Sequence, residues 1–210
     1  MRKGTKSLLF GDHHFLLHPL FLARAWWKLF GFPKSFKLWL CFFIHDLGYW
    51  GKPNMDGEEG RTHPELGANI AHWLLDKKGD VVFWSTYPPI WYEFCLFHSR
   101  YYARQAEHPV SALALADKMA FVITPWWVFI PLARLSGTLK EYMQEAENTD
   151  ESTESPRKWY KSLQDKTYKW MFNTFNQPHP MRGYYNSWEN GNGKVPAIEA
   201  PEKGTVATVS

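Results

Sequence analysis

The sequence predicts an all-α protein built as one bundle of about eight helices, and three observations support this fold class. Proline and glycine recur at intervals that suit the starts and ends of helices. The one strand candidate is the short run Val81-Val82-Phe83-Trp84. A chain of 210 residues with 45% hydrophobic and 18% aromatic residues fits a single domain with a sizeable core.

The first two helices are expected between proline and glycine signals. Pro19 suits a first helical position and Gly31 a C-terminal stop, which predicts a helix over about 19–30. This segment is apolar nearly all round, so we expect the helix to be buried. Pro33 opens a second helix, which is expected to end near Gly48.

A capping box begins the third helix. Thr62 and Glu65 have the spacing of that motif, so a helix is predicted over about 63–77 with Gly79 as its stop. The later helices, most of them opened by a proline, are expected at about 88–103, 109–124, 126–135, 138–147 and 156–175.

These elements divide the chain into four segments, and two of them stand outside the helical domain by composition. A stretch with six acidic residues and no basic one reads as a solvated linker. The end of the chain is rich in Pro, Gly, Asn and small polar residues, which predicts a flexible tail. The segments are a helical domain over 1–140, the acidic linker over 141–155, a C-terminal helix packed on the domain over 156–175 and the tail over 176–210.

Composition and charge also narrow the class of protein. Two cysteines cannot form a disulfide framework, which favours a reducing cytoplasm. A net charge of +3 and a pI near 8.7 are too mild to indicate nucleic-acid binding. The longest apolar runs fall short of the ~20 residues that span a bilayer. We therefore expect a cytoplasmic protein, with its oligomeric state left open.

The N-terminal part of the chain is basic. The first 40 residues hold seven Lys and Arg residues, and their only acid is Asp12. With the nearby aromatic residues this pattern leaves peripheral membrane contact open, beside the simpler interpretation of a solvated basic surface.

Six side chains that can bind metal ions fall mostly near expected helix ends. Imidazole together with carboxylate suits Fe, Mn or Zn, with Mg as a further option, whereas Ca prefers oxygen ligands alone. The two oxygens of the carboxylate next to His45 could bridge two cations and leave positions open for water and substrate. The set therefore predicts a site for two divalent ions. Its members are His18, His45, Asp46, His63, His98 and Asp117.

In order and context these residues resemble the H…HD…H…H…D signature of the HD-domain metal-dependent phosphohydrolase superfamily. The run FIHDLG over 43–48 resembles its LLHDIGK segment, and LADK over 115–118 resembles the ending of several members. The run HPELGA over 63–68 is close to one in the branch that cleaves cyclic di-GMP. The GYP triplet of that branch is absent near His98, and Tyr49 replaces the usual lysine after the glycine. The resemblance covers about residues 14–124.

The resemblance implies a phosphohydrolase or phosphodiesterase. Its substrate would be a nucleotide or another small phosphorylated compound, attacked by a metal-activated water. One metal would take His18, His45, Asp46 and Asp117, and the other His63 and His98, with Asp46 bridging. Cations near the motifs are candidates for binding the phosphate, namely Lys52, Arg61, Arg100 and Lys118. The candidate catalytic residues are Asp46, Lys118, Glu58 and Glu59, where either glutamate could orient the attacking water.

Two other functions remain open at this point. HD-like proteins that resemble myo-inositol oxygenase use the same ligand set for O₂ chemistry, so a diiron oxygenase is the first alternative. A non-catalytic module that binds a nucleotide and signals through the acidic linker and tail is the second.

Other histidines and the cysteines have simpler expected roles. His14 lies four residues before His18 and rivals it as a ligand, although Pro19 argues for His18. The cysteines share helix faces with ligands, yet small core residues are expected there rather than thiolate ligands; they are Cys41 and Cys95. The remaining histidines are expected to face solvent; they are His13, His72, His108 and His179.

Overall fold

The computed structural model describes residues 1–76, 90–148 and 155–176, and every element in these ranges is helical. This confirms the predicted all-α class. The strand candidate Val81–Trp84 and the tail beyond Asn176 lie outside the described residues. In chain order the elements are α1 (Lys3–Phe10), α2 (Leu17–Phe30), α3 (Phe36–Ile44), η1 (Leu47–Tyr49), η2 (Gly60–Thr62), α4 (His63–Leu75), α5 (Ile90–Leu96), α6 (Arg100–Gln105), α7 (Ala112–Ile123), α8 (Trp126–Ser136), α9 (Thr138–Asn148) and α10 (Pro156–Asn176), where η marks a 3₁₀ turn.

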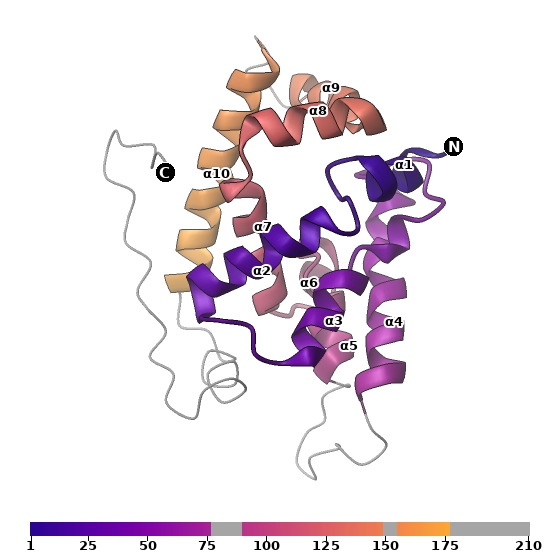
Figure 1. Cartoon of the computed structure of the whole chain (residues 1–210), viewed down its shortest axis with the longest axis vertical. Helices are drawn as coiled ribbons and strands as arrows, with labels where there is room; N and C mark the ends of the chain where they lie inside the picture. Colours follow the sequence, from indigo (N-terminus) through magenta and orange to yellow (C-terminus); the bar gives the residue numbers. More distant parts are fainter. Residues whose placement is uncertain (77–89, 149–154, 177–210) are drawn as a thin grey trace.

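Figure 1 shows how these helices are arranged. Helix α2 crosses the middle of the molecule and packs on α7, while α4 packs on α5. Helices α8 and α9 lie together at the top of the view, where α1 contacts α8. Helix α10 runs down the left side and also packs on α7. Helix α7 therefore packs between α2 and α10 and connects them.

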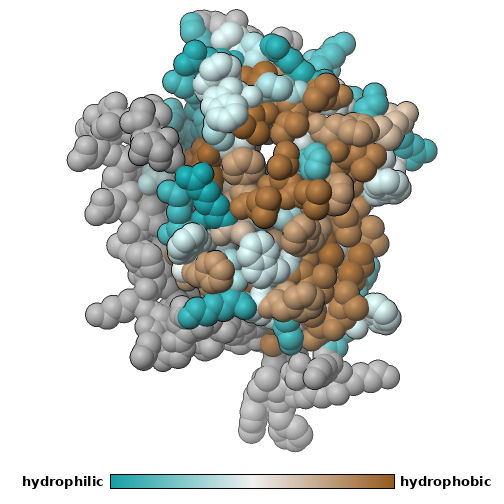
Figure 2. Space-filling model, viewed as in Figure 1, coloured by the Kyte–Doolittle hydropathy of each residue, from teal (hydrophilic) through white to brown (hydrophobic). Residues whose placement is uncertain are grey.

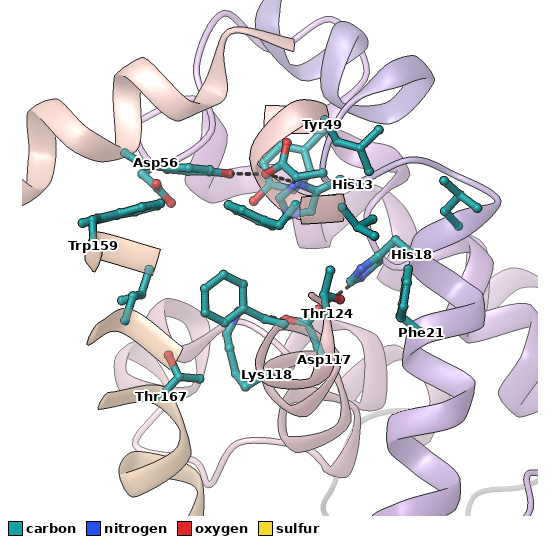
Figure 3. A pocket seen from close by; sticks show the side chains of 18 of the residues that line it. His13, His18, Phe21, Tyr49, Asp56, Asp117, Lys118, Thr124, Trp159 and Thr167 are labelled. Carbon is teal, nitrogen blue, oxygen red and sulfur yellow. Dashed lines mark hydrogen bonds and ion pairs between the residues drawn. The ribbon is translucent and has the colours of Figure 1, made fainter. Parts of the chain in front are cut away.

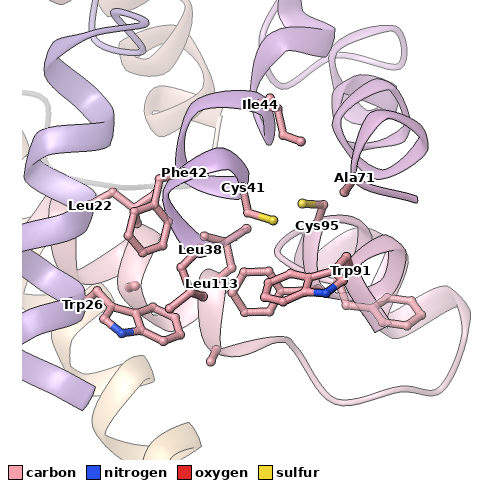
Figure 4. Close-up of a cluster of buried hydrophobic side chains, with 14 of the residues drawn as sticks. Leu22, Trp26, Leu38, Cys41, Phe42, Ile44, Ala71, Trp91, Cys95 and Leu113 are labelled. Atoms are coloured by element: carbon pink, nitrogen blue, oxygen red, sulfur yellow. The ribbon is translucent and has the colours of Figure 1, made fainter. Parts of the chain in front are cut away.

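The main hydrophobic core lies between α2, α3, α4, α5 and α7 (Figure 4). The indole of Trp26 is buried in this core, with its ring centroid 5.6 Å from that of Phe42 and 6.0 Å from that of Phe94. Cys41 and Cys95 are fully buried in the same core, which confirms their expected role. This core fixes the ends of α3 and α5, from which the site described below is built.

A second hydrophobic cluster joins α8, α9 and α10. Phe129 stacks on Tyr160 at 4.5 Å between ring centroids, and Phe121 of α7 packs edge-on to both rings. Trp159 is 3% exposed and completes the cluster. Because these rings are large and interlocked, they hold α10 firmly against the rest of the fold.

The beginning of the chain differs from the expectation. Helix α1 was not predicted, since it has neither a proline at its start nor a side-chain cap. Helix α2 begins two residues before Pro19. The carbonyl oxygen of His14 accepts a hydrogen bond from the His18 N–H at 2.9 Å, and His14 Nδ1 accepts one from the Leu16 N–H at 3.1 Å. His14 therefore supports the start of α2.

The expected helix over 88–103 is broken in the structure. Its described part forms α5 and α6, separated by residues 97–99, and His98 lies in this break. The predicted capping box at Thr62 is wrong, because that side chain does not cap α4 and its hydroxyl donates instead to the carbonyl oxygen of Glu59 at 2.9 Å.

The interval expected as an acidic linker is helical in its first part. Helix α9 runs to Asn148, so residues 141–148 belong to it, whereas 149–154 lie outside the described residues. Among the described residues, no single helix is long and apolar enough to cross a membrane. Helices α7 and α8 reach that length only together, across a bend of 104°.

Candidate metal centre

Six side chains from five parts of the fold converge in one cluster. None of them is more than 13% exposed. The structure thus brings together every residue that the sequence singled out as a candidate metal ligand. They are His18 from α2, His45 and Asp46 after α3, His63 at the start of α4, His98 between α5 and α6, and Asp117 from α7.

Three of the histidines are held by the main chain in the same way. In each, Nδ1 contacts the carbonyl oxygen three residues earlier; the pairs are His45 with Phe42 at 3.0 Å, His63 with Gly60 at 2.8 Å, and His98 with Cys95. A carbonyl oxygen can only accept, so each Nδ1 carries a proton. A neutral ring in this tautomer presents the lone pair of Nε2 to the cluster, as metal binding requires.

The carboxylate of Asp46 lies between these rings, and its two oxygens face different histidines. Oδ2 is 3.1 Å from His45 Nε2 and 3.4 Å from His18 Nε2. Oδ1 is 3.5 Å from the Nε2 atoms of both His63 and His98. This division is the one that a carboxylate bridging two ions would show.

Asp117 completes the half of the cluster that contains His18. Its Oδ1 is 3.1 Å from His18 Nε2, while its Oδ2 accepts a hydrogen bond from Lys118 Nζ at 2.8 Å. The lysine therefore stands at the edge of the cluster, on the side away from His18.

The separations and the unpaired atoms fit divalent ions. Ligand atoms that each lie 2.0–2.2 Å from one ion stand roughly 3–3.6 Å apart, as the contacts with Asp46 do. Two triads, His18–His45–Asp117 and His45–Asp46–His98, have ligand atoms that all lie within 4.8 Å of one another. Among the described residues, His18 Nε2, His45 Nε2 and Asp46 Oδ2 are buried without a hydrogen-bond partner of acceptable geometry. Buried polar atoms without partners are costly, and a bound cation would satisfy them.

Electrostatics favour ionised carboxylates in the cluster. Burial alone would raise the pKa of Asp46, but the neighbouring His45 outweighs it and the pKa lies well below its usual range. Burial would also raise the pKa of Asp117, but the positive charge of Lys118 outweighs it and the pKa lies well below its usual value. Burial lowers the pKa of His63 well below its usual value, which keeps that ring neutral. The pKa of His45 is raised, because the carboxylate of Asp46 outweighs burial there.

Two glycines let α4 approach the turn after α3. A Cβ atom at Gly48 would lie 1.9 Å from the carbonyl oxygen of His63, and one at Gly67 would lie 2.6 Å from the carbonyl oxygen of Ile44. Only a residue without a side chain permits contacts this close. The glycines therefore allow the ring of His63 to reach the cluster.

A cavity of about 440 Å³ opens beside the cluster (Figure 3). This volume is typical of sites for small molecules. His18 and Phe21 of α2 stand on one side and Trp159 and Thr167 of α10 face them across the cavity, with Asp117 below. The cavity thus reaches the half of the cluster that holds His18 and Asp117.

Of the four predicted phosphate-binding cations, two line this cavity, namely Lys118 and Arg100. Lys52 instead donates to the hydroxyl of Thr62, and the exposed Arg61 lies over the ring of Tyr101 at 5.8 Å.

The two glutamates expected to orient water are not among the residues that line this cavity. Glu58 and Glu59 are both exposed, and Glu59 accepts a hydrogen bond from Asn54 Nδ2 at 2.6 Å. Their loop turns these side chains toward solvent.

A buried network of hydrogen bonds lies beside the cluster, and the sequence pattern did not indicate it. Asp12 accepts hydrogen bonds from the hydroxyls of Ser7, Thr138 and Tyr142 at 2.9, 2.9 and 2.8 Å. Its Oδ2 also lies 3.2 Å from Nδ1 of His13, whose ring is close to that of His18. The expectation that His13 faces solvent is therefore wrong. Asp12 is the only acidic residue among the first 40, and a single acid in a basic segment could have indicated a buried ion pair.

This network sets the charge of His13. Burial lowers the pKa of the ring, but the Asp12 carboxylate more than reverses this and raises the pKa to about 9. The hydroxyls and His13 in turn hold the pKa of Asp12 far below its usual range against the effect of burial. An ion pair therefore lies in the cavity wall, because both residues line it.

Tyr49 is a second residue that the sequence did not mark as functional. Its ring stacks on that of His63 with centroids 3.9 Å apart and planes 12° apart, and it also lines the cavity. Tyr49 stands where the resembling family has lysine, so this position supplies an aromatic support for His63.

The remaining histidines differ in their surroundings. The side chain of His72 is 52% exposed, as expected. His108 is half-buried and stacks on Phe97 at 4.2 Å, so its expected exposure is wrong. His179 lies outside the described residues.

Comparison with models of known protein families, with curated proteins and with solved structures finds no match to this chain. The residues and their geometry therefore define the protein by themselves. It is all-helical and contains a buried cluster of histidine and aspartate side chains that could bind metal ions.

Proposed function

We propose that the protein is a metal-dependent phosphohydrolase or phosphodiesterase with two divalent ions. The observation that carries this proposal is the carboxylate of Asp46, whose oxygens are divided between two groups of histidine Nε2 atoms. The likeness of the six residues to the HD-type signature supports the same reaction class. Mn, Fe or Zn suits this mixture of imidazole and carboxylate.

Each part of the cluster has a role in this proposal. His18, His45 and Asp117 would hold one ion, His63 and His98 the other, and Asp46 both. The ions, when bound, would supply charge for the phosphate and lower the pKa of the attacking water. Their open positions would face the cavity through His18 and Asp117, which are the two cluster members that line it.

Cations of this chain would bind the phosphate itself. Lys118 Nζ is anchored at 2.8 Å by Asp117 and stands at the cavity wall, so it can donate to a phosphate oxygen beside the ions. Arg100 lines the same cavity, with its guanidinium 5.2 Å from the centre of the Trp170 ring. Two donors near the reacting group would stabilise the charge that develops in the transition state.

The experiment that tests this proposal compares two histidine variants. The protein is loaded with Mn²⁺, and orthophosphate release from phenyl phosphate is measured together with nitrophenol release from bis(4-nitrophenyl) phosphate. We expect His98→Gln to lower the rate at least 100-fold and His72→Gln, an exposed histidine away from the cluster, to leave it unchanged. Equal rates in His98→Gln and the unaltered protein would contradict the proposal.

Element analysis separates the alternatives. Iron at two atoms per chain, with products that form only when O₂ is present, would favour the diiron oxygenase. A protein that takes up no metal on titration with Mn²⁺, Fe²⁺ or Zn²⁺ would leave only a binding module.

A further inference from the structure

The cavity beside the cluster has polar side chains on one side and apolar side chains on the other. Its polar side carries His18, Asp117, Lys118 and Arg100. The opposite wall, formed by α8, α10 and the end of α7, is apolar and is lined by Phe121, Val128, Phe129, Leu132, Trp159 and Leu163. Hydrophobic side chains also gather over the middle of this face of the molecule (Figure 2). A ligand that binds its phosphate at the cluster can place its organic group against the apolar wall.

This wall is already formed by internal packing. Phe129 is 7% and Trp159 is 3% exposed, and their ring centroids lie 6.5 Å apart. Phe121 packs edge-on to Phe129 at 5.3 Å, and Tyr142 stacks on Trp159 at 6.2 Å. These rings support one another, so no rearrangement is needed before an apolar group can bind.

The polar atoms on the wall are already used by the protein. The Thr124 hydroxyl donates to the carbonyl oxygen of Ala120 at 2.7 Å. The carbonyl oxygen of Thr124 accepts from the Tyr160 hydroxyl at 2.8 Å and from Gln164 Nε2 at 3.1 Å. The Tyr142 hydroxyl donates to Asp12. Within the described part of the chain, few groups on this wall can still bond to a ligand: the Thr167 hydroxyl, the indole N–H of Trp159 and the lone pairs of the hydroxyls named above. The carboxylate of Asp56 lies beside Trp159 at the edge of this wall (Figure 3).

A nucleobase would bind weakly to such a wall. Its edge carries several donors and acceptors, and a protein selects it by pairing them. The few scattered groups on this wall cannot pair them all, and those buried without a partner would weaken binding. An alkyl or aryl group brings no polar atom of its own that needs a partner on this wall.

We propose that the substrate is a phosphoester whose organic group is apolar, an alkyl or aryl phosphate, and that the wall formed by α8, α10 and the end of α7 selects it. This inference rests on the proposed hydrolase function. In the reaction a water oxygen bonds to phosphorus, the bond between phosphorus and the ester oxygen breaks, and that oxygen takes up a proton. The products are orthophosphate and an alcohol or, from an aryl ester, a phenol.

The test measures orthophosphate release by the Mn²⁺-loaded protein from methyl phosphate, hexyl phosphate and 5′-AMP. Because each buried methylene adds to binding, we expect kcat/KM for hexyl phosphate to exceed that for methyl phosphate at least 100-fold and that for 5′-AMP at least tenfold. Equal values for hexyl and methyl phosphate, or a higher value for 5′-AMP, would overturn this inference and leave the hydrolase function standing. Release from none of the three substrates would count against the hydrolase function instead.

A matched pair of variants locates the selectivity. Val128→Thr keeps the volume of the side chain but adds a hydroxyl to the apolar wall, so we expect it to lower the ratio of kcat/KM for hexyl over methyl phosphate about tenfold. Val122→Thr makes the same change on α7 at a residue outside the cavity lining, and it should leave that ratio as it is. An unchanged ratio in Val128→Thr would show that the organic group binds elsewhere.

Discussion

The Nε2 atoms of His63 and His98 face one another at 3.2 Å, although each ring uses its Nδ1 proton for a backbone carbonyl oxygen. Two neutral rings in this state turn lone pairs toward each other, and the nearest group is the Asp46 carboxylate, which offers more lone pairs. Such an arrangement is unfavourable without a cation between its members. It is a strong structural argument that the cluster could bind a metal ion.

Removal of metal should therefore destabilise the protein. We expect the Mn²⁺-loaded protein to unfold about 10 °C above the chelated protein, since a ligand present at 1,000 times its Kd adds about 4 kcal/mol to the free energy of unfolding. Differential scanning calorimetry with and without EDTA, followed by readdition of Mn²⁺, measures this difference. Identical unfolding temperatures would show that the cluster is satisfied without an ion.

The two halves of the cluster should be separable by substitution. Asp117→Asn removes a ligand only from the half that contains His18, so we expect the metal content to fall from about two ions per chain to about one. His98→Ala should have the same effect on the other half, whereas Asp46→Ala should abolish both. Elemental mass spectrometry after dialysis gives these numbers, and a content of two ions in Asp46→Ala would contradict the bridging role.

Gly48 should tolerate no side chain. An alanine there would drive its Cβ into the His63 carbonyl group, and we expect a loss of about 3 kcal/mol or more in the free energy of unfolding. Gly57→Ala is the control, because the three atoms nearest to the added Cβ belong to the side-chain amide of Asn54 and none of them to the backbone. Urea denaturation of both variants compares the costs. A similar small cost in both would mean that α4 can shift away from the turn.

The ion pair of Asp12 and His13 predicts a pH dependence of stability. The pKa of His13 is raised from 6.5 to about 9 in the folded protein. Its contribution is therefore complete below about pH 6.5 and is lost as the pH rises through about 9. We expect the free energy of unfolding of the unaltered protein to exceed that of His13→Gln by on the order of 1–3 kcal/mol at pH 6, and by much less at pH 9.5. A difference that does not vary with pH would exclude the charged ring.

The sequence predicted the helical class and the residues of the cluster. The helix class followed from proline and glycine spacing, and the six cluster residues followed from their order along the chain. The partners of Asp12 could not be found in this way, because Thr138 and Tyr142 lie more than 120 residues away and reach it only through the packing of α9. That contact is a product of tertiary structure.

The same reason explains the candidates that the structure places away from the cavity. The chain between Asp46 and α4 holds Lys52, Glu58 and Glu59. Their nearness to Asp46 in sequence suggested nearness to the cluster. The direction of a loop side chain depends on local hydrogen bonds, here those of Lys52 with Thr62 and of Glu59 with Asn54. Residue type and spacing do not encode that direction.

The anchoring of His45, His63 and His98 by main-chain carbonyl groups has a consequence for how such a protein can diverge. A side-chain substitution cannot delete a carbonyl oxygen, so the main-chain partner of each ring persists when neighbouring side chains change. The walls of the cavity, by contrast, are made of side chains. Over evolutionary time the cavity can therefore exchange one set of ligands for another while the imidazoles of the cluster keep their main-chain partners.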